Sequence, residues 1–194
     1  HSLSHPHLLD LDSGQVLDEI KNAQKRLRKH LKVTAKILAY PYGEANLAIM
    51  QSVKNLDYTA FGQHSGVVSA SSNWQNLPRF PMAANYAKMP KFREKVNALP
   101  MPLVARKINP IFTQNPPTLK LEFPQALSKQ QKSQFMCFVK GGVNMVWSGN
   151  KSVKITAKKR LKKRRSKYNC TFPSGQKGRF YWHSVQWINP KIAE

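Results

Sequence analysis

The sequence lacks an apolar run long enough to cross a bilayer, and no signal peptide is visible at its start. The first absence excludes a transmembrane helix, since such a helix needs about 20 apolar residues. The second absence excludes little, because residues can precede His1 in a parent protein. With 41% hydrophobic and 10% aromatic residues, the 194-residue chain can still bury a core, as one large domain or two small ones.

Acidic residues are scarce: 9 Asp and Glu stand against 32 Lys and Arg, which gives a formal net charge of +23. The excess is uneven, with 15 basic against 7 acidic residues in 1–107 and 17 against 2 in 108–194. Such a charge favours polyanions, whether nucleic acid, anionic glycan or a lipid headgroup surface. The sharpest run, at residues 158–165, is either a polyanion contact or a solvated loop whose lysines protect a sheet edge.

Only two cysteines occur, Cys137 and Cys170, and both lie in the C-terminal part. An even count in a strand-rich region predicts a disulfide and an oxidising compartment, so we expect an exported protein that is periplasmic, envelope-associated or secreted. The bond would remove about 3–4 kcal/mol of unfolded-chain entropy. Two buried free thiols are the alternative, which a cytosolic protein would allow.

Apolar periodicity in the first part of the chain predicts helices that alternate with strands, the order typical of an α/β barrel. Val16, Leu17 and Ile20 recur at helical spacing, and Ser13 is expected to cap that helix. The predicted helices are residues 14–31, 46–56 and 90–99. Residues 33–40 are a predicted strand, and residues 57–62 are predicted to turn into another strand.

A Pro-rich linker at residues 99–102 precedes a change in the sequence pattern. Beyond it, short alternating runs separated by turn residues predict an all-β sandwich. Cys137, Trp147 and a tyrosine two residues before Cys170 are similar to the core of an immunoglobulin-type domain. We therefore expect an immunoglobulin-like sandwich, with the disulfide between its two sheets and packed on Trp147. The predicted domains are residues 1–106 and 107–194.

The first six residues, His-Ser-Leu-Ser-His-Pro, hold the main candidate for chemistry. His1 and His5 stand four residues apart, so one helical turn or a tight loop can aim both rings at one point. Imidazole is the commonest protein ligand for zinc-like metals, and a catalytic site needs three protein ligands plus an open position. On its own, such a pair is more often two surface histidines.

The neighbourhood of the pair changes that interpretation. With Tyr-Pro-Tyr-Gly at residues 40–43, after a predicted helix and strand, the motif resembles the polysaccharide deacetylases of the nodulation-protein type, carbohydrate esterase family four. The resemblance implies that His1 and His5 hold a divalent metal, usually zinc. It also implies an upstream Thr-Phe-Asp-Asp-Gly-like motif that supplies a third ligand and the catalytic base. That motif is absent, so we expect a fragment of a partial (β/α) barrel that needs its missing N-terminal segment and is inactive alone.

The same resemblance assigns roles to the second motif. Tyr40, Pro41 and Gly43 would line the substrate site, and the amide of Tyr42 would help to hold the acetyl oxyanion. Ala39 stands where the family more commonly has arginine, which leaves open how the catalytic base is oriented.

Leu-Pro-Arg-Phe at residues 77–80, together with the Tyr-Pro-Tyr-Gly form, is similar to deacetylases of poly-N-acetylglucosamine-like exopolysaccharides. Arg79 is then expected to orient a carboxylate, or else to be an exposed loop arginine. No late motif supplies the general acid, and His64, which follows a predicted strand, is the candidate for that role.

We therefore expect an enzyme that uses a divalent metal, zinc, to hydrolyse N-acetyl groups of an amino-sugar polysaccharide. The alternative is a catalytically inactive deacetylase fold whose basic sandwich binds a glycan or an envelope surface. In either case the run at residues 158–165 is expected to contact an anionic glycan or a membrane surface, and no nucleic acid is expected. A third interpretation makes His1 a true mature N-terminus, whose amine and imidazole chelate copper as in oxidative polysaccharide enzymes.

Overall fold

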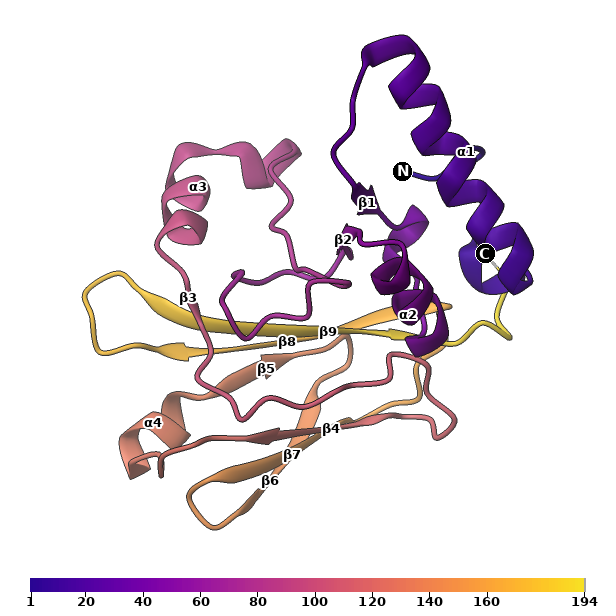
Figure 1. The fold of residues 1–194 in the computed structure, drawn as a ribbon. Helices are drawn as coiled ribbons and strands as arrows, with labels where there is room; N and C mark the ends of the chain where they lie inside the picture. Colours follow the sequence, from indigo (N-terminus) through magenta and orange to yellow (C-terminus); the bar gives the residue numbers. More distant parts are fainter. Residues whose placement is uncertain (194) are drawn as a thin grey trace. The chain divides into compact units, whose positions relative to one another are not determined.

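The computed structural model describes residues 1–193 (Figure 1). The chain forms two compact units: an N-terminal unit, His1–Gln63 with Ala70–Arg79, and a C-terminal unit, His64–Ser69 with Phe80–Glu194. A segment of the predicted first domain, Leu99–Pro100, pairs with the last strand of the C-terminal unit, and the predicted domain boundary at residue 106 stays a prediction. Within residues 1–193, no helix is both long enough and apolar enough to cross a bilayer.

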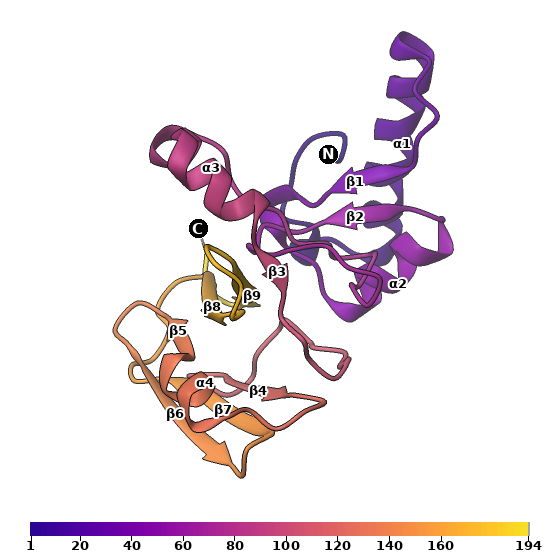
Figure 2. The same cartoon turned by 90° about the vertical axis from the view of Figure 1, so that its left-hand side faces the viewer.

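The N-terminal unit is a small α/β structure. Its two short strands pair in parallel, with Leu38 beside Ala60, and lie side by side in both ribbon views (Figures 1 and 2). A two-stranded sheet is not a barrel, so the predicted partial barrel stays a prediction. The elements are α1 (Ser13–Leu31), β1 (Ile37–Ala39), α2 (Leu47–Asn55) and β2 (Thr59–Phe61).

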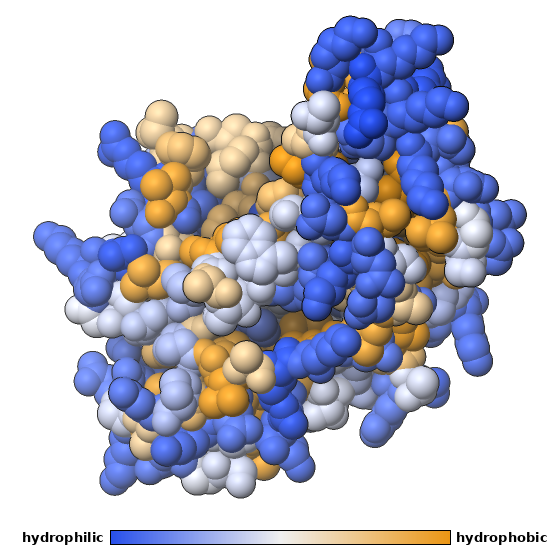
Figure 3. Space-filling view, viewed as in Figure 1, coloured by the Kyte–Doolittle hydropathy of each residue, from blue (hydrophilic) through white to orange (hydrophobic). Residues whose placement is uncertain are grey.

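Helix α1 follows the predicted periodicity but begins differently. Asp12, not Ser13, is its N-cap: the Asp12 carboxylate accepts from the amide of Gln15, whose side chain accepts from the Asp12 amide in return. Val16 and Ile20 are buried on one face. Lys and Arg fill the opposite face, which is hydrophilic along the helix (Figure 3).

The predicted strand at residues 33–40 shortens to β1. Its parallel partner β2 offers only three residues for pairing, and only Leu38 of β1 is fully buried. A strand needs backbone partners as well as an apolar sequence. Residues 33–36, which are exposed, therefore remain outside the sheet.

The C-terminal unit holds two sheets, one with the strand order β3-β9-β8-β5 and the other with the order β4-β7-β6 (Figure 2). All paired strands except β3 and β9 run antiparallel. Its elements are α3 (Met89–Val96), β3 (Leu99–Pro100), β4 (Thr118–Glu122), α4 (Lys129–Gln134), β5 (Met136–Phe138), β6 (Val143–Ser148), β7 (Ser152–Ala157), β8 (Arg165–Pro173) and β9 (Phe180–Ile188).

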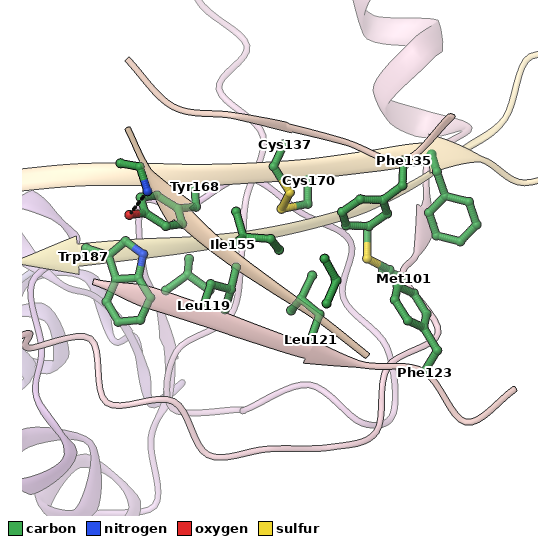
Figure 4. Packing of buried hydrophobic residues seen from close by; sticks show 14 of the residues in the cluster. Met101, Leu119, Leu121, Phe123, Phe135, Cys137, Ile155, Tyr168, Cys170 and Trp187 are labelled. Atoms are coloured by element: carbon green, nitrogen blue, oxygen red, sulfur yellow. Dashed lines mark hydrogen bonds between the residues drawn. A yellow bond between two sulfur atoms is a disulfide. The ribbon is translucent and has the colours of Figure 1, made fainter. Parts of the chain in front are cut away.

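Both sheets contribute to one apolar core (Figure 4). Leu119 and Ile155 come from one sheet, and Tyr168 and Trp187 come from the other. The immunoglobulin-like assignment of this two-sheet arrangement stays a prediction.

The predicted disulfide between Cys137 and Cys170 is present. Its predicted position between the two sheets is wrong: the two cysteines are register partners on neighbouring strands, β5 and β8, of the same sheet (Figure 4). Trp147 instead packs against Phe123 and Phe135, with ring centroids 6.3 and 5.6 Å away. The bond therefore ties an edge strand to its neighbour.

Tyr168 is fully buried in the C-terminal core, and its hydroxyl has two hydrogen-bond partners. It donates to the carbonyl of Pro117 at 2.8 Å and accepts from the amide of Ala157 at 3.0 Å. Burial raises the pKa of this phenol. The two hydrogen bonds join the segment before β4 to the end of β7.

Replacing Tyr168 with Phe should lower the free energy of unfolding by about 1–3 kcal/mol, because it leaves a buried amide and a buried carbonyl without a partner. Urea unfolding measures the loss. Tyr86→Phe is the matched control in the same unit, since Tyr86 is 55% exposed; it should change stability by less than about 0.5 kcal/mol. Equal losses in the two variants would contradict the role of the Tyr168 hydroxyl.

Candidate functional site

The loop that carries the histidine pair is fixed to α1 by Glu19. The carboxylate of Glu19 accepts from the Ser4 amide at 2.9 Å and from the Ser4 hydroxyl at 2.7 Å, and its backbone carbonyl accepts from Leu3 at 3.1 Å. Burial alone would raise the pKa of this carboxyl, but the hydrogen bonds from Ser4 lower it overall. Glu19 thus holds the loop between the two histidines in place.

The structure brings His1 and His5 together, as predicted. Their ring centroids are 4.8 Å apart and the ring planes are tilted by 55°. His5 adopts a left-handed backbone conformation with φ 64°, which is uncommon for a residue with a side chain. Such conformations persist where the surrounding structure holds them, and they concentrate at functional sites.

Tyr42 extends the pair into a cluster of four rings. Its ring lies edge-on to His5, at a centroid distance of 4.8 Å, and stacks on His7 at 3.9 Å with an interplanar angle of 11°. His7 Nδ1 lies 3.1 Å from the carboxylate of Glu44, which is fully buried. We call His1, His5, His7, Tyr42 and Glu44 the histidine cluster.

Sequence reasoning missed His7 and Glu44, although each follows a recognised motif directly. His7 comes after the His-Ser-Leu-Ser-His-Pro segment, and Glu44 comes after Gly43. The position of each titratable side chain directly after a motif was the only sequence signal that could have indicated its place in the site. The contact between them spans 37 positions of sequence, which no local pattern encodes.

The turn at residues 40–43 points only one of its side chains toward the histidines. Tyr40 is fully buried and donates its hydroxyl to the carbonyl of Gln75 at 2.7 Å, and burial raises the pKa of its phenol. Pro41 and Gly43 are buried as well. These three residues support the turn that carries Tyr42, and their place in the substrate site stays a prediction.

The backbone of this turn is left-handed at two successive residues, with φ 55° at Tyr42 and 68° at Gly43. A Cβ at Gly43 would lie 2.6 Å from the backbone nitrogen of Gln63, so only glycine fits there. The amides of Gly43 and Glu44 donate within the turn, to Tyr40 and Pro41.

Arg79 does not meet the predicted carboxylate in the part of the chain that the structure describes. Its Nε donates to the carbonyl of Gly62 at 2.9 Å. The arginine thereby ties the end of the N-terminal unit to the residue that follows β2. A role in orienting a carboxylate stays a prediction.

His64 belongs to the C-terminal unit, so the structure does not group it with the histidine cluster. Its neighbours there include His183 and Lys167. Burial, followed by repulsion from Lys167 and from His183 when that residue is protonated, lowers the pKa of His64 to about 4, and burial lowers that of His183 to about 4. At pH 7 an imidazole with this pKa is mostly neutral, and the role of His64 as general acid stays a prediction.

Two imidazoles suit a zinc-like ion by chemistry and by their approach in space. Among residues 1–193, however, no third His, Cys, Asp or Glu joins them within ligand reach. Asp12 is engaged as the cap of α1. By their chemistry the two imidazoles fit two positions of a divalent-metal site, and residues 1–193 alone do not form a three-ligand group.

The stability of the C-terminal unit should fall as pH drops from about 6.5 to about 4. Over this range the unfolded chain protonates His64 and His183 while the folded chain, with both pKa values near 4, does not. Urea unfolding at stepped pH measures the effect. His183→Gln should remove about half of the pH dependence, whereas His30→Gln, on the exposed face of α1, should leave it unchanged. A pH-independent stability across this range would contradict the lowered pKa values of these two half-buried imidazoles.

The segment that contains the histidine cluster is similar to a known protein family. Residues 1–61 match the polysaccharide deacetylase family. No curated protein sequence matches the chain. Among solved structures, the deacetylase PplD of Streptococcus pyogenes, in complex with acetate, is 28% identical over 41% of this chain and 35% of that chain, with a TM-score of 0.39. The chain thus spans about a third of that enzyme, and its residues 1–61 are similar to the polysaccharide deacetylases.

Proposed function

We propose that the N-terminal unit forms part of the active site of a polysaccharide N-deacetylase. The observation that carries the proposal is the approach of the His1 and His5 rings, 4.8 Å apart, beside Tyr42 and inside the segment that matches the family. The substrate would be an amino-sugar polysaccharide of the exopolysaccharide type. The disulfide suits an exported protein, because such bonds persist in oxidising compartments.

In this proposal His1 and His5 supply two ligands of a divalent metal, with zinc as the expected ion. When bound, zinc polarises a carbonyl and lowers the pKa of a coordinated water toward about 7. A carboxylate from outside residues 1–193 would complete the ligand set, and a second carboxylate would take the proton. Glu19 keeps the loop between the two histidines fixed on α1, which lowers the cost of ordering the ligands on binding.

Tyr42 would contact the acetyl group of the substrate. Its amide is the proposed donor to the oxyanion that forms when water adds to the acetyl carbonyl. His7 stacks on the Tyr42 ring, and the buried carboxylate of Glu44 lies against His7. These two contacts hold the Tyr42 side chain in position. Hydrolysis then breaks the C–N bond and yields acetate and a free amine.

Zinc binding tests the ligand assignment without requiring activity. His1→Ala and His5→Ala should each weaken zinc binding about tenfold or more, because each removes a direct ligand. Competition with a chromogenic chelator measures the affinity. His30→Ala is the control, since His30 is exposed and lies near the end of α1. Equal affinity in His5→Ala and the unaltered chain would overturn the assignment.

The 194-residue chain alone should release no acetate above background from acetylated glucosamine oligomers, even with zinc. Among residues 1–193 no carboxylate joins His1 and His5 in a metal-binding group, and the proposal places the catalytic base on a further segment. Lack of a positioned base typically costs about 10²–10⁴ in rate. Supplying an N-terminal segment with the Asp-Asp motif, fused or as a separate polypeptide, should produce activity. Acetate release by the short chain would mean that Asp10 or Asp12 does this work. No release with the segment present, despite intact zinc binding, would favour a catalytically inactive deacetylase fold.

A further inference from the structure

The basic run between β7 and β8 is an ordered loop with its cations turned outward. We call residues 158–165 the basic loop. Leu161 and Arg164 are buried, at 7% and 4% exposure. The exposed cations of the loop are Lys158, Lys159, Arg160, Lys162 and Lys163.

Hydrogen bonds fix the loop along its length. Asn115 accepts from the Leu161 amide at 2.7 Å and donates to the Leu161 carbonyl at 2.9 Å. Arg164 Nη1 donates to the carbonyl of Pro190 at 3.2 Å. The amide of Lys158 donates to the carbonyl of Gly142 at 3.0 Å. A loop fixed in this way loses little conformational entropy when it binds a ligand.

The turn between β5 and β6 adds to the same end of the two-sheet unit. A Cβ at Gly141 would lie 3.5 Å from Cδ of Lys159, and a Cβ at Gly142 would lie 3.4 Å from Cδ of Lys158. The lysine stems therefore pack on the glycine turn, which leaves their ammonium groups at the surface. Lys140, in the same turn, is exposed as well.

Two further lysines continue the basic surface onto the open face of the β4-β7-β6 sheet. Lys120 and Lys154 are exposed and stand directly opposite one another in the register. Like charges so placed are destabilising. Lys154 precedes Lys158 by four residues, about 13 Å along an extended strand. An anion bound between these groups would relieve the repulsion.

Carboxylates that could neutralise this surface are nearly absent. The C-terminal unit has 23 Lys and Arg against 3 acidic residues. Glu94 is paired with Lys91 and Lys95, at 3.1 and 2.7 Å. Glu122 lies on β4 at the end away from the basic loop, and it makes no ion pair with the residues that the structure describes. The exposed cations of the basic loop are thus available to pair with an external anion.

We propose that the basic loop, Lys140 and the Lys120–Lys154 pair form a binding surface for an acidic polysaccharide, a flexible chain that bears carboxylate, sulfate or phosphate groups. The inference is independent of the deacetylase proposal. Side chains on the sheet face stand perpendicular to the sheet, whereas the loop extends from the strand ends. A planar bilayer would touch one of these surfaces, but a flexible polymer bends to touch both. The disulfide favours a compartment in which glycans, not nucleic acids, are the usual polyanions.

The experiment measures binding of the full chain to polygalacturonate across a salt series. The loop variant combines Lys158→Gln, Lys159→Gln, Lys162→Gln and Lys163→Gln, and the face variant combines Lys120→Gln and Lys154→Gln. The loop variant should weaken binding about tenfold or more and reduce the slope of log K against log salt by about one for each lysine that pairs with the polymer. The face variant should show a smaller loss of the same kind. Circular dichroism confirms that each variant is folded.

The matched control removes four exposed lysines from the N-terminal unit: Lys21→Gln, Lys25→Gln, Lys29→Gln and Lys32→Gln. It has the same net charge as the loop variant and should bind as the unaltered chain does. An equal loss in the control would show that net charge alone drives binding, and would overturn the proposal. Phosphatidylserine vesicles and duplex DNA are the other arms. Tighter binding to either than to polygalacturonate would also overturn it, by assigning the surface to a membrane or to nucleic acid.

Discussion

The close approach of Gly43 to the backbone of Gln63 determines the geometry of the histidine cluster. A side chain at position 43 would collide with that backbone, so the turn can pass under the end of β2 only as glycine. The left-handed conformation of Tyr42 then places its ring between His5 and His7. The proposed ligand pair on one loop is thereby linked, through the contact of His5 with Tyr42, to the proposed oxyanion donor on another.

Glu44 anchors this arrangement from the inside. A carboxylate removed from water costs several kcal/mol unless it is partnered, and His7 is one of its partners. His7 is held in turn by the Tyr42 ring on which it stacks. Packing and electrostatics therefore fix Glu44, His7 and Tyr42 together, and the Tyr42 ring in turn contacts His5.

Local patterns in the sequence predicted what local physics determines. The spacing of Val16 and Ile20 predicted α1, and short alternating runs separated by turn residues predicted that strands make up the C-terminal part. The approach of His1 and His5 followed from their spacing and from the family resemblance. The pairing of Cys137 with Cys170 followed from there being only two cysteines.

Features that depend on contacts distant in sequence were not predictable. Helix α4 buries no residue and so leaves no apolar period; only its Ser128 cap, which accepts from Gln131, marks it. The disulfide lies within one sheet because of the register of β5 with β8, which no spacing encodes. His64 joins the C-terminal unit although its sequence neighbours before it belong to the other.

The position of the disulfide has a consequence for the basic surface. The bond closes a covalent ring between residues 33 positions apart, and this ring contains the glycine turn, β6, β7 and the whole basic loop. In the chain-entropy account, closing a ring of this length is worth about 4 kcal/mol. Strand β5 has a single sheet neighbour and only three residues, so the bond secures the weakest edge of the ring. The cations proposed to bind an external polymer thus lie on a covalently closed ring of the chain. A reducing environment would break the disulfide and remove this covalent constraint on the basic loop.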